Sequence, residues 1–243
     1  MPQELALALI FLVSGFTMSF AGFGFALVSV PLLALLLPIK DAVALQFPYC
    51  LALFLYQAWH YRAHFSWGPM RPLVLGTALG LAIGTFMLYN LPEAALKRAL
   101  AGFIAAVVLF NALPAGKAFV ARHAQSPWWG RFCGFVSGSF FGAYTIGGPP
   151  AALYIMSVSD DALKAKSFLA SFFSIQFILM AFVYGAGGMF SWEGLRGSLI
   201  YSPAVIAGSA LGFWAFAKAS NRLYRQVVSL MLMATAIVLW WRA

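Results

Sequence analysis

Very little of this sequence is charged: Asp, Glu, Lys and Arg make up 9% of its 243 residues, whereas 63% are hydrophobic. A soluble domain carries roughly 25% charged residues, so a chain this poor in charge cannot cover a water-facing surface. Long apolar runs between short charged loops fit a lipid environment instead. The net charge of +9 is scattered over those loops, which argues against nucleic-acid binding. We therefore expect an all-α polytopic membrane protein.

Groups that carry catalysis or bind metals are also scarce. The two cysteines, Cys50 and Cys133, have no second metal ligand nearby in the sequence. The six acidic residues and three histidines flank the apolar segments, so no carboxylate lies mid-membrane, where proton and cation carriers usually keep one. There is no Ser-His-Asp order, metal-ligand spacing or phosphate loop. The sequence thus predicts a protein that is not an enzyme and has no metal site and no cofactor.

Apolar segments long enough to cross a bilayer follow one another along the chain. A crossing helix needs about 20 apolar residues. Two stretches, 5–37 and 132–156, contain clusters of glycine and proline, which break helices. We expect each of them to form a hairpin of two short helical legs. Six other segments fit single crossings: 42–59, 72–89, 94–113, 162–184, 195–216 and 223–240.

The two broken stretches begin two copies of one sequence pattern. Matches in chain order join Gly15 to Gly134, Pro31 to Pro150, Arg71 to Arg196, and the ladder Gly80-Gly84 to Gly208-Gly212. The offset between matched positions grows slowly, as loop insertions would make it, and internal repeats are common in transporters. We expect a first repeat at 1–115 and a second at 116–243.

The distribution of Lys and Arg favours hairpins over single broken crossings. With single crossings the basic residues divide seven to eight between the two sides, whereas with hairpins they divide ten to five. Because Lys and Arg accumulate in cytoplasmic loops, we favour a hairpin plus three crossings in each repeat. Three is an odd number, so the second repeat would be inverted. This arrangement predicts a bacterial inner-membrane protein with both termini outside the cytoplasm, its N-terminal segment being retained in the membrane.

The hairpin turns, near 20–24 and 142–150, are the best candidates for a binding site. Backbone N–H groups at a helix start carry partial positive charge and bind anions. Two inverted hairpins would bring two such starts together near the midplane. The alternative is that the glycines only let helices pack closely. The turn residues expected to bind substrate are Gly22, Phe23, Gly24, Tyr144, Thr145, Gly147 and Gly148, and Pro31, Pro149 and Pro150 are expected to break the helices.

Polar side chains within the crossings extend this candidate site. Gln46 and Tyr49 lie in 42–59, and Ser171 and Gln176 lie in 162–184. Their amides and hydroxyls can donate to anion oxygens, although serine also serves helix packing in lipid.

Two arginines occupy matched positions at the starts of the crossings 72–89 and 195–216. Arg71 and Arg196 each follow a Trp by four residues. They either lie in the headgroup region beside that Trp or attract anions at opposite mouths of the pathway.

These motifs resemble those of the TauE/SafE, or sulfite exporter, family of membrane proteins. The resemblance covers nearly the whole chain. It rests on the glycine-rich segments that end in proline, 21–31 and 141–150, and on the repeated Trp-to-Arg and glycine-ladder segments. It implies transport of small sulfur-containing anions, such as sulfite or organosulfonates including sulfoacetate.

The expected function is therefore a secondary transporter that exports small anions held between the two hairpins. A membrane potential that is negative inside drives anions outward with about 2.3 kcal/mol per charge for each 100 mV. An uptake carrier for a carboxylate, an anion channel and a membrane scaffold or enzyme subunit are the alternatives. The expected partners are a small anion and the lipid bilayer, with homo-oligomers possible and the coupling ion left open.

Overall fold

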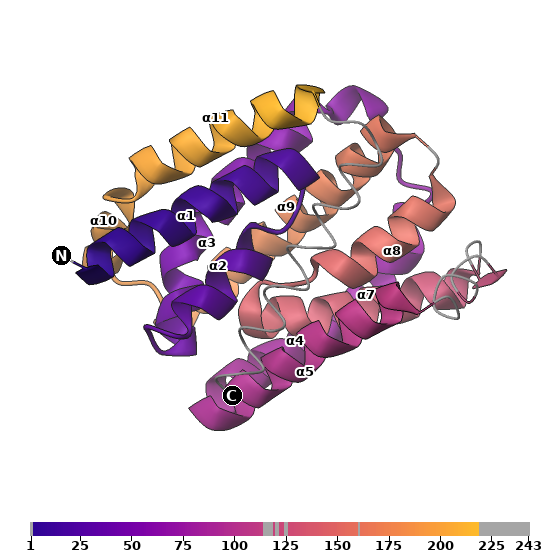
Figure 1. Cartoon of the computed structure of the whole chain (residues 1–243). Helices are drawn as coiled ribbons and strands as arrows, with labels where there is room; N and C mark the ends of the chain where they lie inside the picture. The colour runs from indigo at the N-terminus through magenta and orange to yellow at the C-terminus, as the bar shows by residue number, and fades with distance from the viewer. Residues whose placement is uncertain (1, 114–118, 120–121, 124–125, 160, 219–243) are drawn as a thin grey trace.

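The computed structural model describes residues 2–113, 119, 122–123, 126–159 and 161–218, and there the chain folds into helices only (Figure 1). Four helices are long and apolar enough to cross a membrane: α1, α3, α4 and α9. The protein is thus an all-α multi-pass membrane protein. The helices are α1 (Pro2–Ala21), α2 (Phe25–Leu33), α3 (Ile39–His60), η1 (Arg62–His64), α4 (Met70–Asn90), α5 (Glu93–Ala112), α7 (Pro127–Tyr144), α8 (Gly148–Val158), α9 (Ala162–Ala186), α10 (Trp192–Leu199) and α11 (Ser202–Lys218).

Each glycine-rich stretch forms a helical hairpin with legs of unequal length. In Figure 1, α2 turns back along α1, and α8 turns back along α7. The first legs, of 20 and 18 residues, are longer than the short legs that we expected; at 1.5 Å per residue, α1 is about 30 Å long. The second legs have 9 and 11 residues. Each hairpin therefore combines a leg of near-membrane length with a short leg that begins inside the bundle.

The two hairpins enter the bundle from opposite ends. Figure 1 shows α3 beginning at the end of the bundle where α1 begins, and α9 beginning at the other end, where α7 begins. Each hairpin thus returns to its starting end. This is the arrangement that an inverted duplication requires.

Close glycine contacts hold two helix pairs together in matching ways. A Cβ at Gly134 on α7 would lie 2.0 Å from the Leu73 carbonyl oxygen on α4, and a Cβ at Gly15 on α1 would lie 2.7 Å from that of Val205 on α11. Reciprocally, a Cβ at Gly208 on α11 would lie 2.0 Å from the Leu12 carbonyl oxygen on α1. Such backbone approaches are the usual role of glycine ladders in membrane helices.

The glycines of α4 and α11 make equivalent contacts within the two helix pairs. Gly76 on α4 meets the Arg131 carbonyl as Gly208 on α11 meets that of Leu12. Gly76 and Gly208 thus have equivalent places in their helix pairs, and the match of Gly80 with Gly208 along the sequence stays a prediction.

Proline acts differently from our expectation at two places. The expected crossing 195–216 is divided into α10 and α11, because Pro203 has no N–H for a continuous helix. Pro31 does not break a helix but lies inside α2, and the first break is made by Gly22 and Gly24 with φ of 80° and 109°. Pro149 and Pro150 do mark the second break, in the first turn of α8. The expected crossing 223–240 lies outside the described residues.

The cavity between the two helix breaks

The two breaks meet and line one cavity of about 20 Å³. Its walls come from both hairpins and from α3 and α9. A Cβ at Gly148 would lie only 2.8 Å from Cδ2 of Phe23, so the second break touches the first directly. The cavity exceeds the roughly 10–15 Å³ that one water molecule needs. The lining residues are Phe23, Gly24, Phe25, Ala26, Leu27, Phe54, Thr145, Ile146, Gly147, Gly148 and Phe173.

Two helix starts face this cavity without side-chain caps. The cap residues are Gly24 for α2 and Gly147 for α8, and neither can offer a side-chain acceptor. The first N–H groups of a helix have no partner within the helix and carry its positive dipole end. Pro149 and Pro150 provide no N–H, so the start of α8 has few backbone donors, and at the start of α2 the N–H of Ala26 already contacts the Cys50 sulfur. No charged side chain among the described residues lines the cavity.

Thr145 shapes the second break through its backbone and its hydroxyl. It is the one described non-glycine residue with positive φ, at 57°, and its N–H donates to the Phe141 carbonyl oxygen at 2.7 Å. Its hydroxyl accepts a 2.5 Å hydrogen bond from Nε2 of Gln46, which is fully buried on α3. The Gln46 amide oxygen in turn accepts from the thiol of Cys50 at 2.7 Å. Gln46 thus ties α3 to the break.

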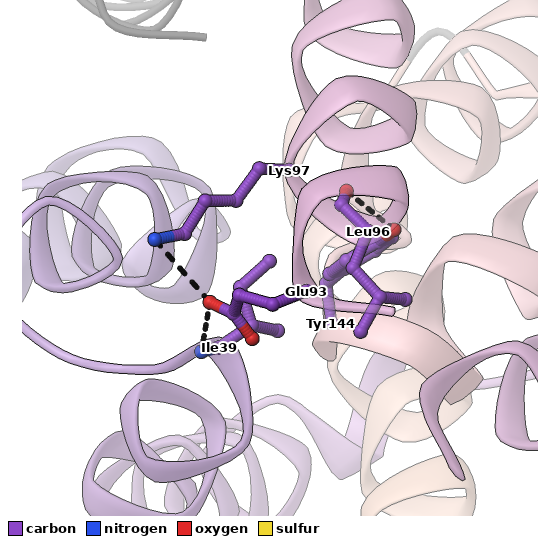
Figure 2. Close-up of polar contacts among 5 residues, drawn as sticks. All are labelled: Ile39, Glu93, Leu96, Lys97 and Tyr144. Carbon is purple, nitrogen blue, oxygen red and sulfur yellow. Dashed lines mark hydrogen bonds and ion pairs between the residues drawn. The ribbon is translucent and has the colours of Figure 1, made fainter. Parts of the chain in front are cut away.

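Two tyrosines that we expected to bind substrate lie outside the lining of the cavity. The Tyr144 hydroxyl donates to the Leu96 carbonyl oxygen at 2.9 Å, which joins the end of α7 to α5 (Figure 2). The Tyr49 hydroxyl donates to the Ser198 carbonyl oxygen beside the break between α10 and α11. Both hydroxyls therefore stabilise helix ends.

Figure 2 also shows how α5 is joined to the start of α3. Glu93 accepts from the N–H of Ile39 at 3.0 Å and pairs with Lys97 at 3.3 Å. A carboxylate at a helix N-terminus is electrostatically favourable. Together with the Tyr144 hydrogen bond, this contact links α7, which ends at the second break, through α5 to the start of α3.

The remaining predicted residues lie around the cavity or far from it. Gln176 is buried, and its amide has no hydrogen-bond partner among the described residues, whereas Ser171 is half-buried. Gly22 lies one residue before the lining, against the side chain of Lys166. Arg71 and Arg196 are exposed, and the Arg196 guanidinium lies 5.0 Å from the Trp192 ring centroid.

Sequence reasoning missed the burial of Lys166. It placed Lys166 among the loop cations, but the side chain is only 8% exposed. Its position four residues inside an apolar segment was the one available signal.

The comparison with family profiles agrees with the motif-based resemblance. The profile described as sulfite exporter TauE/SafE matches residues 7–239, which is nearly the whole chain. The searches of curated proteins and of solved structures found no match. With four apolar helices of membrane-crossing length and this match, the chain belongs to the TauE/SafE sulfite exporter family of membrane transporters.

Proposed function

We propose that this transporter exports small anions, sulfite foremost, and binds them in the cavity between the starts of α2 and α8. The observation that carries the proposal is that two helix breaks far apart in the sequence line one cavity, with uncapped helix starts facing it. Non-helical backbone inside a bilayer survives only where protein or water satisfies it. An anion at this place would accept hydrogen bonds from those N–H groups.

The walls of the cavity favour a compact anion of low charge. They are largely aromatic and aliphatic, with Phe23, Phe54 and Phe173 among them. The edges of aromatic rings carry partial positive charge, but none of the described residues that line the cavity has an ammonium or guanidinium to balance a second negative charge. With about 20 Å³ the cavity has room for little more than one water molecule, so the hairpins would have to separate to admit an anion, and further for an organosulfonate such as sulfoacetate than for sulfite.

The membrane orientation follows from the ends at which the basic residues lie. Arg62, Arg71, Arg131, Lys164 and Lys218 lie at helix ends on the side where α1 ends, whereas Lys40, Lys97, Arg98 and Arg196 lie on the side where α1 begins (Figure 1). Because Lys and Arg accumulate in the cytoplasm, the first side would face the cytoplasm of a bacterial inner membrane. Both termini would then lie outside it, in two inverted repeats.

Purified protein in liposomes tests the proposal. We expect saturable sulfite flux that responds to an imposed potential and shows counter-transport, with weaker flux of sulfoacetate, taurine and carboxylates. Counter-transport distinguishes a carrier from a channel. Flux of none of these anions would refute the proposed function.

A matched pair of glycine variants tests the place of binding. Gly148→Ala pushes a methyl group against Phe23 in the cavity, whereas Gly185→Ala adds one in open space on α9. We expect Gly148→Ala to lower sulfite flux by about tenfold, which corresponds to about 1.4 kcal/mol, and Gly185→Ala to leave it unchanged. Equal flux in both variants would place binding elsewhere.

A further inference from the structure

Lys166 is a buried cation close to the cavity. Its ammonium group lies inside the bundle, and no carboxylate of the described side chains is within 4.0 Å of it. An ionisable side chain inside a membrane protein is costly and is found chiefly at functional sites. Its neighbours therefore decide what this charge can do.

Among the described residues, two aromatic rings lie next to the ammonium. Nζ lies 3.2 Å from the Phe216 ring centroid and 5.9 Å from that of Tyr61. Burial raises the pKa of the Tyr61 phenol above its usual value, and Tyr56 adds to this shift, so the phenol stays neutral. Cation–π contacts stabilise a desolvated ammonium but leave its net charge uncancelled. The field of Lys166 thus remains available to an anion.

The first helix break provides the space for this side chain. A Cβ at Gly22 would lie 3.3 Å from Cε and 3.4 Å from Cγ of Lys166, so the aliphatic stem crosses the bare backbone of the break. Gly22 is followed directly by Phe23 and Gly24, which line the cavity. The glycine therefore joins the lysine to the cavity wall.

Helix geometry places the lysine between the cavity and the basic end of the bundle. Lys166 and Phe173 are seven residues apart on α9, which is about two turns or 10 Å, and they share one helix face. Phe173 lines the cavity, and Lys166 lies nearer the start of α9, where Lys164 is exposed.

We propose that Lys166 is the positioning cation of the transport pathway, holding the anion beside Gly22 as it passes between the cytoplasmic end of the bundle and the cavity. This inference rests on the proposed function. The lysine attracts the anion through space without lining the cavity, and its ammonium contacts aromatic rings and no carboxylate of the described side chains. It also supplies the positive charge that the walls of the cavity lack.

The test compares four variants in sulfite binding and flux. For a unit charge about 10 Å away at an effective dielectric constant near 20, removal should weaken binding by roughly tenfold. We expect Lys166→Met and Lys166→Gln to show this loss, measured as a change in KM for flux and as sulfite concentration dependence in thermal-shift binding. Lys166→Arg should retain most of the affinity. Lys164→Met, which removes an exposed lysine two residues away, should change little.

Several outcomes would overturn this role. Sulfite affinity at the wild-type level in Lys166→Met would overturn it. Equal losses of sulfite affinity in Lys166→Met and Lys164→Met would also overturn it, because they indicate a general effect of surface charge. If both neutral variants failed to fold while Lys166→Arg folded, the charge would be structural and the proposal wrong. Absence of sulfite flux and binding in the wild-type protein would refute the proposed function itself, and this inference with it.

Discussion

The hydrogen bond between Gln46 and Thr145 is expected to hold the second break in its binding geometry. The bond is 2.5 Å long and joins α3 to the break at a fully buried position. Thr145→Val keeps the shape and β-branching of the side chain but removes the acceptor. Gln46→Leu removes the donor. Thr145→Val leaves Nε2 of Gln46 without its acceptor, whereas after Gln46→Leu the Thr145 hydroxyl still donates to the Tyr144 carbonyl oxygen. The double variant removes both groups.

The size of the coupling follows from the surroundings of the bond. Leaving a buried donor unpaired costs about 1–3 kcal/mol, but hydrogen bonds between membrane helices average about 0.6 kcal/mol and reach about 1.7. Because Gln46 is fully buried and the bond fixes a residue with positive φ, we expect a coupling free energy of about 1 kcal/mol, toward the upper part of that range. The double variant should therefore lose less unfolding free energy than the two single variants lose together.

The assay is a double-mutant cycle on unfolding in mixed micelles, with sulfite flux measured in parallel. We expect both single variants to weaken sulfite affinity, because the backbone at position 145 then loses the conformation with which it lines the cavity. Thr145→Ser is the control, since it keeps the hydroxyl and should retain both stability and affinity. Additive effects within about 0.3 kcal/mol, together with normal flux in both single variants, would refute the reasoning.

Three other perturbations follow from the packing and the charges. Gly134→Ala should destabilise the protein by about 1–3 kcal/mol or more in thermal unfolding, because its Cβ would lie 2.0 Å from the Leu73 carbonyl oxygen; Gly102→Ala, which has open space around it, should not, and equal stability of both would contradict the packing. Ser66 and Asn90 are both exposed and lie at opposite ends of α4. On intact cells an impermeant maleimide should label Asn90→Cys but not Ser66→Cys, and the reverse would invert the proposed orientation. The native Cys50 and Cys133 are buried and should not react. Arg71→Gln and Arg196→Gln should each weaken sulfite affinity by only about twofold to fivefold, since exposed charges are screened; unchanged transport in both would exclude a role at the pathway mouths.

The sequence predicted the features that depend on local backbone chemistry. Apolar runs indicated the helices, and the glycine clusters indicated the breaks, because positive φ at Gly22 and Gly24 is available to few other residues. The break before α11 was missed, although Arg196, Ser198 and Ser202 interrupt the apolar run just before Pro203. The prediction that Pro31 breaks a helix was wrong, because α2 extends only two residues past it and little helix remains to be broken.

The candidate site was harder to predict, because it depends on contacts between distant segments. Tyr49 and Tyr144 look available in the sequence, but their hydroxyls reach carbonyl groups 149 and 48 positions away. Lys166 looks like a loop cation until Gly22 and Phe216 come together around it. The sequence shows which side chains are polar, but it does not show which group each of them contacts in the folded protein.

The binding of an anion between the two breaks can be observed directly with selenite, the selenium analogue of sulfite. Anomalous diffraction from crystals of the protein with selenite would locate the selenium atom. We expect one peak between Gly24 and Gly148, within reach of the first N–H groups of α2. A peak at another place in the protein, or an empty cavity at a selenite concentration that saturates transport, would contradict the account.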